Sequence, residues 1–165
     1  MKKLTLILIF TSITFGLFSQ EFEIPKGYSL EVADDYAKYE NDIIKCIDWL
    51  METPINEQAS KRKDANAFLL KWMSGSPYMH LEIKQEIVTF MTTPELLMVF
   101  MGGWTKYSLV NKDFDNQIAG SIAGIDAVIE FYSKNKQFIK KDRNVEKYIK
   151  MKNKETLKEY VEKNA

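Results

Sequence analysis

One cysteine and one histidine are the side chains of this 165-residue chain on which nucleophilic chemistry would first depend. Cys46 and His80 belong to the types that combine as an activated thiol and its base. The residues around Cys46, however, form an apolar face: Ile43, Ile44, Ile47 and Leu50. This setting predicts a buried, unreactive thiol. A single cysteine excludes an internal disulfide and a single histidine excludes multi-histidine metal sites, so no metal and no cofactor is expected.

Acidic residues are numerous, and two of them have a spacing that suits acid–base chemistry. Glu82 and Glu86 are four residues apart and would share one face of a helix, whereas Asp34 and Asp35 are adjacent and would diverge. General acid–base catalysis needs two carboxylates across a cleft, in unlike environments. No feature of the sequence predicts such a cleft. An enzyme with a pair of catalytic carboxylates is therefore kept as an alternative to a non-enzymatic protein.

The segment that begins at Asn111 resembles the start of a calcium-binding loop. Asn111, Asp113 and Asp115 have the alternating spacing of oxygen ligands in such loops. The pattern then departs, because Asn116 stands where the turn glycine belongs and Ile122 where the bidentate glutamate belongs. We therefore interpret Asp113 or Asp115 as the N-cap of a following helix.

Large aromatic side chains are the best candidates for a binding surface in a chain without a catalytic motif. Four of them belong to the predicted helices or their links: Trp72, Tyr78, Trp104 and Tyr107. We expect the exposed members of this set to line a groove on a central helical hairpin. The predicted role is that of a binding or accessory protein, whose partner is another envelope protein or a peptide.

The element that must position these aromatics is a helical hairpin over residues 94–134. Thr93 suits a helix N-cap and Pro94 suits the first helical position. An apolar stripe with the period of a helix follows: Leu96, Leu97, Phe100, Met101, Trp104, Tyr107 and Ser108. A turn at Lys112 and Asp113 separates this helix from a second amphipathic one.

Small residues predict that the two helices of the hairpin pack closely. Gly102 and Gly103 each cost about 1 kcal/mol relative to Ala in a helix interior, and the close approach of another helix, most simply the next along the chain, would offset this. That helix has a face of small residues: Gly120, Ala123, Gly124 and Ala127. Gly120 and Gly124 have the spacing found in membrane helix pairs, but the charged residues nearby predict a soluble core instead.

Further helices flank the hairpin and complete a compact all-α bundle of about six helices. Longer ones are expected from residue 30 or 33 to residue 52 and over residues 56–75, and short ones over 82–91, 142–151 and 154–163, the last capped by Asn153. In the second helix, the three basic residues are expected to face solvent: Lys61, Arg62 and Lys63.

The first nineteen residues have the features of a secretory signal peptide. Two lysines precede an apolar run, Leu4–Phe18, that is too short to span a bilayer comfortably. We expect cleavage near Ser19, after which residues 20–29 form an extended leader and residues 30–165 a single helical domain without a transmembrane span. The protein is then expected in the periplasm or outside the cell, and an uncleaved anchor is the alternative.

Charge is balanced over the whole chain but not along it. The net charge is zero, whereas residues 134–165 contain eleven lysines and arginines and five acidic residues. The alternation of these charges favours solvated helix faces, and no nucleic-acid partner is expected. The alternative is that the basic C-terminal helices bind anionic surfaces of the cell envelope.

Overall fold

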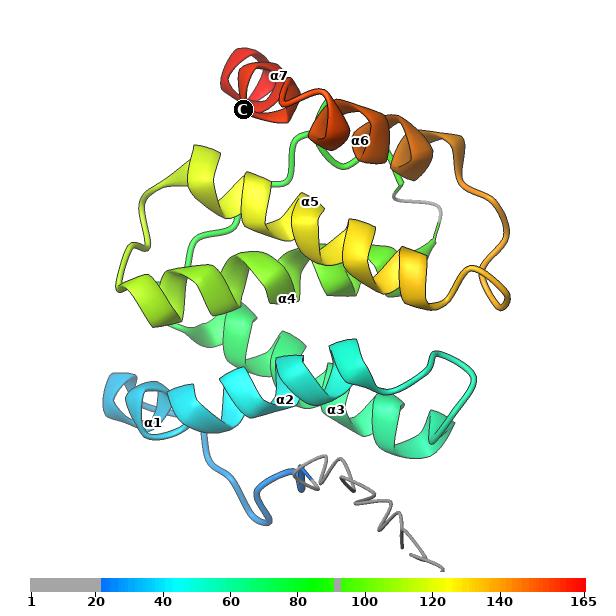
Figure 1. Ribbon diagram of the computed structural model, residues 1–165. Coiled ribbons are helices and arrows are strands. Elements are labelled where there is room, and N and C mark those ends of the chain that lie inside the picture. The colour runs from blue at the N-terminus through cyan, green and yellow to red at the C-terminus, as the bar shows by residue number, and fades with distance from the viewer. Residues whose placement is uncertain (1–21, 91–92) are drawn as a thin grey trace, which may run out of the picture.

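Seven α-helices and no strand occur in the part of the chain that the computed structural model describes, residues 22–90 and 93–165 (Figure 1). They are α1 (Ala33–Lys38), α2 (Glu40–Glu52), α3 (Ala59–Gly75), α4 (Pro94–Asn111), α5 (Gln117–Lys134), α6 (Arg143–Asn153) and α7 (Leu157–Asn164). The predicted all-α class is confirmed for these residues. The predicted signal peptide, residues 1–19, lies outside them.

The α4–α5 hairpin forms the middle tier of the molecule. Figure 1 shows α4 and α5 side by side, with α2 and α3 below them and α6 and α7 above. α4 packs against α2, α3 and α5, whereas α5 also contacts α6 and α7. The hairpin therefore contributes to the core on both sides, toward α2 and α3 and toward α6 and α7. Phe100 and Trp104 of α4 are among its fully buried side chains.

Three glycines lie in the seam between α4 and α5, as the small-residue pattern predicts. A Cβ atom on Gly103 would come within 2.5 Å of the Cβ of Ala127, and one on Gly120 would overlap the indole of Trp104. Gly124 has no room for a side chain either, because the ring of Phe100 on α4 covers it. The two helices therefore approach more closely than any other residue type at these positions would allow.

Gly102 is an exception to the predicted arrangement. A Cβ atom on Gly102 would meet the side chain of Ile47 at 3.5 Å, and Leu69 lies next to it. The glycine pair therefore serves two interfaces: Gly103 faces α5, while Gly102 faces α2 and α3.

The helix predicted over residues 30–52 is divided at Tyr39. The backbone there leaves helical geometry, with φ −100° and ψ 3°. The indole N–H of Trp72 donates to the carbonyl of Tyr36 at 2.9 Å, and in an unbroken helix this carbonyl would accept from the N–H of Glu40. The carbonyl of Tyr36 accepts instead from Trp72 of α3 and from the N–H of Tyr39 at 3.2 Å.

The short helix predicted over residues 82–91 is wrong for the residues described. Residues 76–90 form an irregular link with isolated turns, although Ile87, Val88 and Phe90 are buried as the pattern suggested. The hydroxyl of Tyr148 donates to the carbonyl of Ile87 at 2.6 Å, and that of Tyr160 donates to the carbonyl of Glu86 at 2.8 Å. These side chains satisfy backbone groups that a helix would have paired internally.

Two helix starts also differ from the prediction. α3 begins at Ala59 rather than near residue 56, because Gln58 precedes it in the left-handed region with φ 48°. Asn153 is the last residue of α6 and does not cap α7, which begins after Thr156. No helix within residues 22–90 and 93–165 is both long and apolar enough to cross a bilayer.

Candidate functional site

The structure separates the four aromatics of the predicted groove into two groups. Trp72 and Trp104 are buried, so they belong to the core and do not line a surface. Tyr78 and Tyr107 are partly exposed, and both contact the turn between α4 and α5, at Phe114 and Asp113 respectively. Only these two are therefore available to a partner in this conformation.

Tyr78 closes the junction between the lower tier and the hairpin turn. Its ring packs against Trp72 at 6.1 Å and against Phe114 at 5.0 Å between centroids. Its hydroxyl donates to Glu40 at 2.9 Å. Burial, and then this hydrogen bond, raise the pKa of Tyr78 above its usual value. These contacts are those of a structural residue.

Tyr107 lines a groove of about 800 Å³ that lies between α2 and α5, with α4 as its floor. Three residues that line the groove at the seam between α4 and α5 have little or no side chain: Gly103, Ala123 and Ala127. Apolar side chains from all three helices form its walls: Ile47, Met51, Val110 and Ile129. The small residues that let α4 and α5 approach each other also place no large side chain in the space along the seam between them. This space is the groove.

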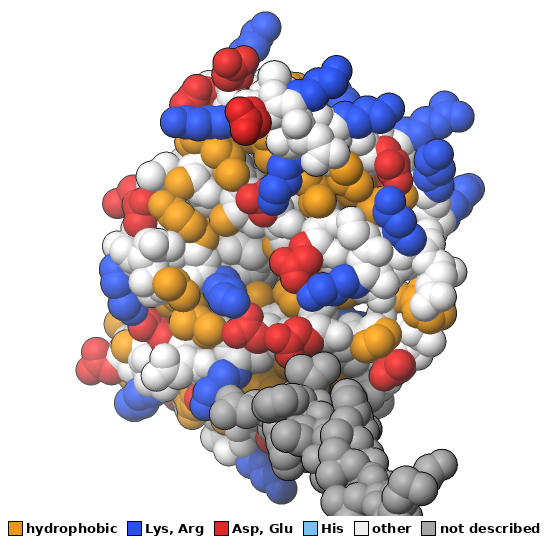
Figure 2. Space-filling view, in the orientation of Figure 1, with side chains coloured by type: hydrophobic (Ala, Val, Ile, Leu, Met, Phe, Trp, Pro, Cys, Tyr) orange, Lys and Arg blue, Asp and Glu red, His pale blue; other side chains and the backbone are white. Residues whose placement is uncertain are grey.

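Charged side chains border the groove on both sides. Lys152 pairs with Asp126 at 2.7 Å, Lys134 pairs with Glu130 at 2.7 Å, and Lys106 pairs with Asp48. The side chains in these pairs are 40–58% exposed, so the pairs add little stability. Figure 2 shows acidic and basic side chains interspersed on the face formed by α2 and α5, with apolar side chains between them.

Glu52 is the fourth carboxylate of this border. Within the described residues it takes part in no ion pair, so the lining of the groove carries one more negative charge than positive. A general acid needs a carboxyl group shielded from water, whereas Asp48 and Asp126 are about two-fifths exposed. The groove therefore offers an apolar floor with charged edges rather than an enclosed acid–base pair.

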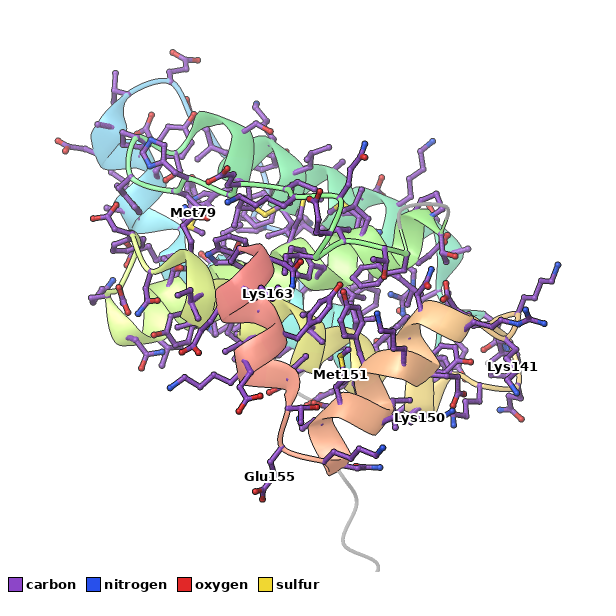
Figure 3. All side chains as sticks on the ribbon, turned by 90° about the horizontal axis from the view of Figure 1, so that it is seen from above. Met79, Lys141, Lys150, Met151, Glu155 and Lys163 are labelled. Carbon is purple, nitrogen blue, oxygen red and sulfur yellow. The ribbon has the colours of Figure 1, made fainter. Side chains whose placement is uncertain are left out.

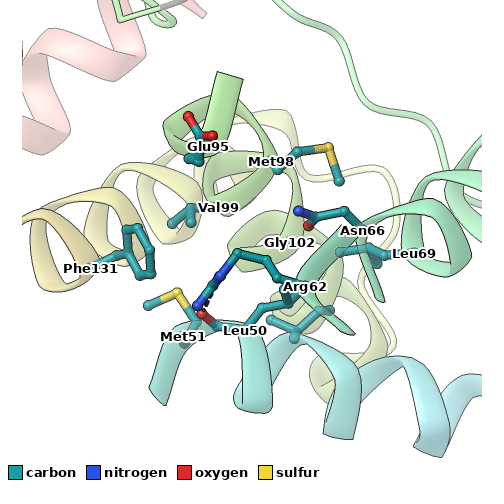
Figure 4. Close-up of a pocket in the computed structure, with 11 residues that line it drawn as sticks. Leu50, Met51, Arg62, Asn66, Leu69, Glu95, Met98, Val99, Gly102 and Phe131 are labelled. Atoms are coloured by element: carbon teal, nitrogen blue, oxygen red, sulfur yellow. Dashed lines mark hydrogen bonds between the residues drawn. The ribbon is translucent and has the colours of Figure 1, made fainter. Parts of the chain in front are cut away.

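A second, smaller cavity surrounds Arg62 (Figure 4). It has about 20 Å³ of space, which is room for about one water molecule. Leu69, Val99 and Phe131 are among its apolar walls, and Glu95 stands at its edge. It is too small for a metabolite.

Arg62 was predicted to face solvent, and this prediction is wrong: the residue is 8% exposed. Its guanidinium donates to the carbonyls of Leu50 at 3.1 Å and Pro54 at 3.2 Å, and also to that of Thr53. These carbonyls lie at and just beyond the end of α2, where the helix leaves its acceptors without partners. Burial lowers the pKa of Arg62. The residue caps α2, which the charge pattern could not reveal.

Cys46 and His80 lie in different environments. Cys46 is fully buried between α2 and α3, where its thiol lies 3.5 Å from the carbonyl of Ala65. Burial raises the pKa of Cys46 to about 12, so the nucleophilic thiolate is scarce at neutral pH. His80 is exposed on the link between α3 and α4.

The acidic residues before α5 hold the turn of the hairpin. The carboxylate of Asp113 accepts from the hydroxyl of Tyr107 and from the amide of Asn116, both at 2.9 Å. Asn116, not Asp113 or Asp115, caps α5, because its side chain accepts from the N–H of Ala119 at 3.0 Å. The described residues contain no group of three or more His, Cys, Asp or Glu side chains that could hold a metal ion.

Sequence reasoning found the small residues of the groove but assigned them to packing alone. The walls of the groove could not be predicted, because nothing in the spacing of Met51 and Val110 along the chain marks them. These two residues line the same groove only in the folded chain. Comparisons of the chain with protein-family models, with curated proteins and with solved structures gave no match. The site must therefore be interpreted from its own geometry.

Proposed function

We propose that this chain is an exported binding protein that holds a helical segment of a partner protein in the groove between α2 and α5. The observation that supports the proposal is the groove itself, whose floor at Gly103, Ala123 and Ala127 allows another backbone to approach closely. Charged residues along the edges suit a partner that is polar on its outer side.

The dimensions of the groove favour a helix as the occupant. The α4 residues that line it run from Gly103 to Asn111, and eight steps of about 1.5 Å span roughly 12 Å, or about two helical turns. Grooves of this kind take helices through apolar anchors at positions i, i+3 or i+4, and i+7. Met51, Val110 and Ile129 would contact those anchors.

The charge of the border favours a partner with a basic flank. Three of the four carboxylates are already paired with lysines, which leaves Glu52 to attract a lysine or arginine. Since Glu52 is exposed, its attraction for a basic residue contributes more to orientation than to affinity.

A peptide-display selection on the purified protein tests the groove. We expect enriched peptides to carry apolar residues at helical spacing and to bind the Val110→Lys variant at least tenfold more weakly than the parent, measured by fluorescence anisotropy. Val32→Lys is the matched control, because Val32 is 60% exposed, Val110 is 61% exposed, and Val32 lies outside the groove. Equal binding to the two variants, or no enriched peptide, would reject the groove.

Export is the second part of the proposal and rests on the residue pattern of the first nineteen positions. We expect mass spectrometry of the protein from an envelope or extracellular fraction to show a chain that begins at or near Gln20. Recovery of the intact 165-residue chain from the cytoplasm would contradict export without affecting the test of the groove.

A further inference from the structure

The outward face of α6 carries a stripe of cations. Arg143, Lys147 and Lys150 follow one another at steps of four and three residues, so they share one face of the helix, and Lys154 stands four residues further on as its C-cap. All four are exposed, and the opposite face is buried through Val145 and Tyr148. Figure 3 looks onto α6 and α7 and labels Lys150 on this side.

The cations of the stripe have no carboxylate partner among the described residues. None of its four members appears in the ion pairs formed by residues 22–90 and 93–165. The ammonium of Lys147 lies 4.9 Å from the ring centre of Tyr160, which leaves its charge in place. From residue 134 to residue 154 the chain has nine basic residues and only two acidic ones.

The segment before α6 combines more cations with an exposed aromatic. Phe138 is 46% exposed and is the one aromatic among the large apolar side chains that the described chain leaves exposed. Exposed lysines stand on both sides of it: Lys136, which pairs with Glu146 at 3.5 Å, and Lys140 and Lys141, which form no ion pair with another described residue. In Figure 2 basic side chains gather at the upper right, over α6 and the segment that leads into it.

Phe138 is exposed although the backbone around it is held in place. The N–H groups of Phe138 and Ile139 both donate to the carbonyl of Asn135, at 2.9 and 3.0 Å, and Asn135 is buried. Ile139 packs against the core while its neighbour Phe138 does not belong to the core cluster. Figure 1 shows this connection as a loop that projects from one edge of the molecule.

We propose that the α6 stripe and the Phe138 loop form a docking surface for a membrane that contains anionic phospholipid. Clustered lysines and arginines are attracted to the negative surface of such a membrane. An exposed aromatic among them inserts at the level of the headgroups, where apolar area adds to the electrostatic attraction. This surface is separate from the groove, so the inference does not rest on the proposed function.

A membrane explains the loop better than a free polyanion does. Proteins that bind single-stranded nucleic acid stack successive bases on several aromatic side chains along a groove. Phe138 instead stands alone in a projecting loop and takes part in no aromatic pair with another described residue. A polyanion would need the cations but would gain little from this one ring.

Vesicle co-sedimentation tests the proposal with vesicles of phosphatidylcholine alone or with about one-third phosphatidylglycerol. We expect binding to the mixed vesicles at low salt that weakens at least tenfold in about 0.5 M NaCl, where the Debye length falls to a few ångströms. Lys150→Glu should weaken binding by more than about fivefold, the effect of removing one cation near an anionic surface. Phe138→Ser should weaken it at low and high salt alike, because its contribution is apolar.

Two control variants match these changes on a distant helix. Lys63 is an exposed lysine of α3, and Leu70, also on α3, is 46% exposed, as is Phe138. Lys63→Glu and Leu70→Ser should bind as the parent does. All variants share the same N-terminal residues, so differences between them report on this surface alone. Circular dichroism establishes that each variant is folded.

The alternative outcomes each overturn the proposal. Equal binding to vesicles with and without phosphatidylglycerol, or no binding to either, would remove the electrostatic attraction on which it rests. Binding that Lys150→Glu abolishes but Phe138→Ser leaves unchanged, together with tighter binding to heparin than to vesicles, would make the surface a polyanion site instead.

Discussion

Gly103 of α4 lies so close to Ala127 of α5 that a Cβ atom on the glycine would come within 2.5 Å of the Cβ of the alanine. The carbonyl oxygen of Ala123 would be 2.9 Å away. Real Cβ atoms do not approach other atoms so closely, and both neighbours belong to the rigid part of a helix. The hairpin therefore requires glycine at this position, and the same residues form the floor of the groove.

Gly103→Ala should lower the free energy of unfolding by about 1–2 kcal/mol. Overpacking of a close seam costs about 1–3 kcal/mol, and the higher helix propensity of Ala returns up to about 1 kcal/mol of this. Urea denaturation followed by circular dichroism measures the difference.

The adjacent glycine provides the control for this substitution. A Cβ atom on Gly102 would stand 3.5 Å from Ile47, which is an ordinary van der Waals distance. Gly102→Ala should therefore leave stability unchanged or raise it by up to about 1 kcal/mol, through helix propensity alone. If the two substitutions had the same effect, the seam would not be the reason for Gly103.

Arg62→Met should lower the free energy of unfolding by about 2–4 kcal/mol. The change removes a donor from three carbonyls. That of Pro54 still accepts from the N–H of Glu57 at 3.0 Å, whereas those of Leu50 and Thr53 lose their partner, at about 1–3 kcal/mol for each buried acceptor. Arg62→Lys should recover part of the loss, because an ammonium group reaches fewer of these carbonyls than the planar guanidinium does. Thermal and urea unfolding both measure this order of stability.

Lys63→Met is the matched control for Arg62. Lys63 is the next residue of α3 and is exposed, so its replacement should change stability by no more than about 0.5 kcal/mol. Equal stability losses at the two positions would contradict a cap formed by Arg62.

The central hairpin could be predicted because its signals are local. Thr93 and Pro94 mark the start of α4, and the small residues of both helices recur at helical spacing. Such patterns depend only on neighbours along the chain, and the structure places Gly103, Gly120 and Gly124 in the predicted seam. The calcium-like segment likewise proved to be a turn, although its cap is Asn116.

Three further differences between the predicted and the observed structure involve partners that are distant in sequence. Trp72 donates to the carbonyl of Tyr36 where the first predicted helix is divided, and Tyr148 donates to the carbonyl of Ile87 in the link before α4. Arg62 is buried because the end of α2 needs donors. A sequence pattern contains the polarity of each residue but not the identity of such a partner.

The candidate site was predictable only in part for the same reason. Tyr107 is among the residues that line the groove. Trp72 and Trp104, in contrast, are core residues, and aromatic type alone does not distinguish a buried ring from an exposed one.

The buried thiol of Cys46 should make stability depend on alkaline pH. Its pKa is about 12 in the folded chain and about 8.5 in an unfolded one. Because the folded value is raised, the stabilising contribution is complete below about pH 8.5 and is lost as the pH rises toward 12, at about 1.4 kcal/mol per pH unit. The free energy of unfolding of the parent, relative to that of Cys46→Ala, should therefore fall by about 2 kcal/mol between pH 8 and pH 10.

Urea unfolding of both proteins over this pH range measures the difference, and tyrosine and lysine titrations common to both cancel. Native Cys46 should also react with iodoacetamide far more slowly than the unfolded chain does at pH 8. Parallel stability curves for the two proteins would mean that the thiol is not buried as described.

Asn135 joins two parts of the molecule that are eighty residues apart. Its side-chain oxygen accepts from the N–H of Ile55 at 2.9 Å, and its side-chain nitrogen donates to the carbonyl of Phe131 at 2.9 Å. The residue is 2% exposed. In Asn135→Ala the carbonyl of Phe131 still accepts from the backbone N–H of residue 135, at 3.0 Å in the parent, but the N–H of Ile55 loses its partner. We therefore expect a loss of about 1–3 kcal/mol in the free energy of unfolding. Asn153→Ala, at an exposed position of α6, should change it by less than about 0.5 kcal/mol.

Amide hydrogen exchange tests the same bond locally. The N–H of Ile55 should exchange faster in Asn135→Ala than in the parent, and at the parent's rate in Asn153→Ala. If the protection of Ile55 were unaltered in Asn135→Ala, Asn135 would not hold the α2–α3 loop against α5.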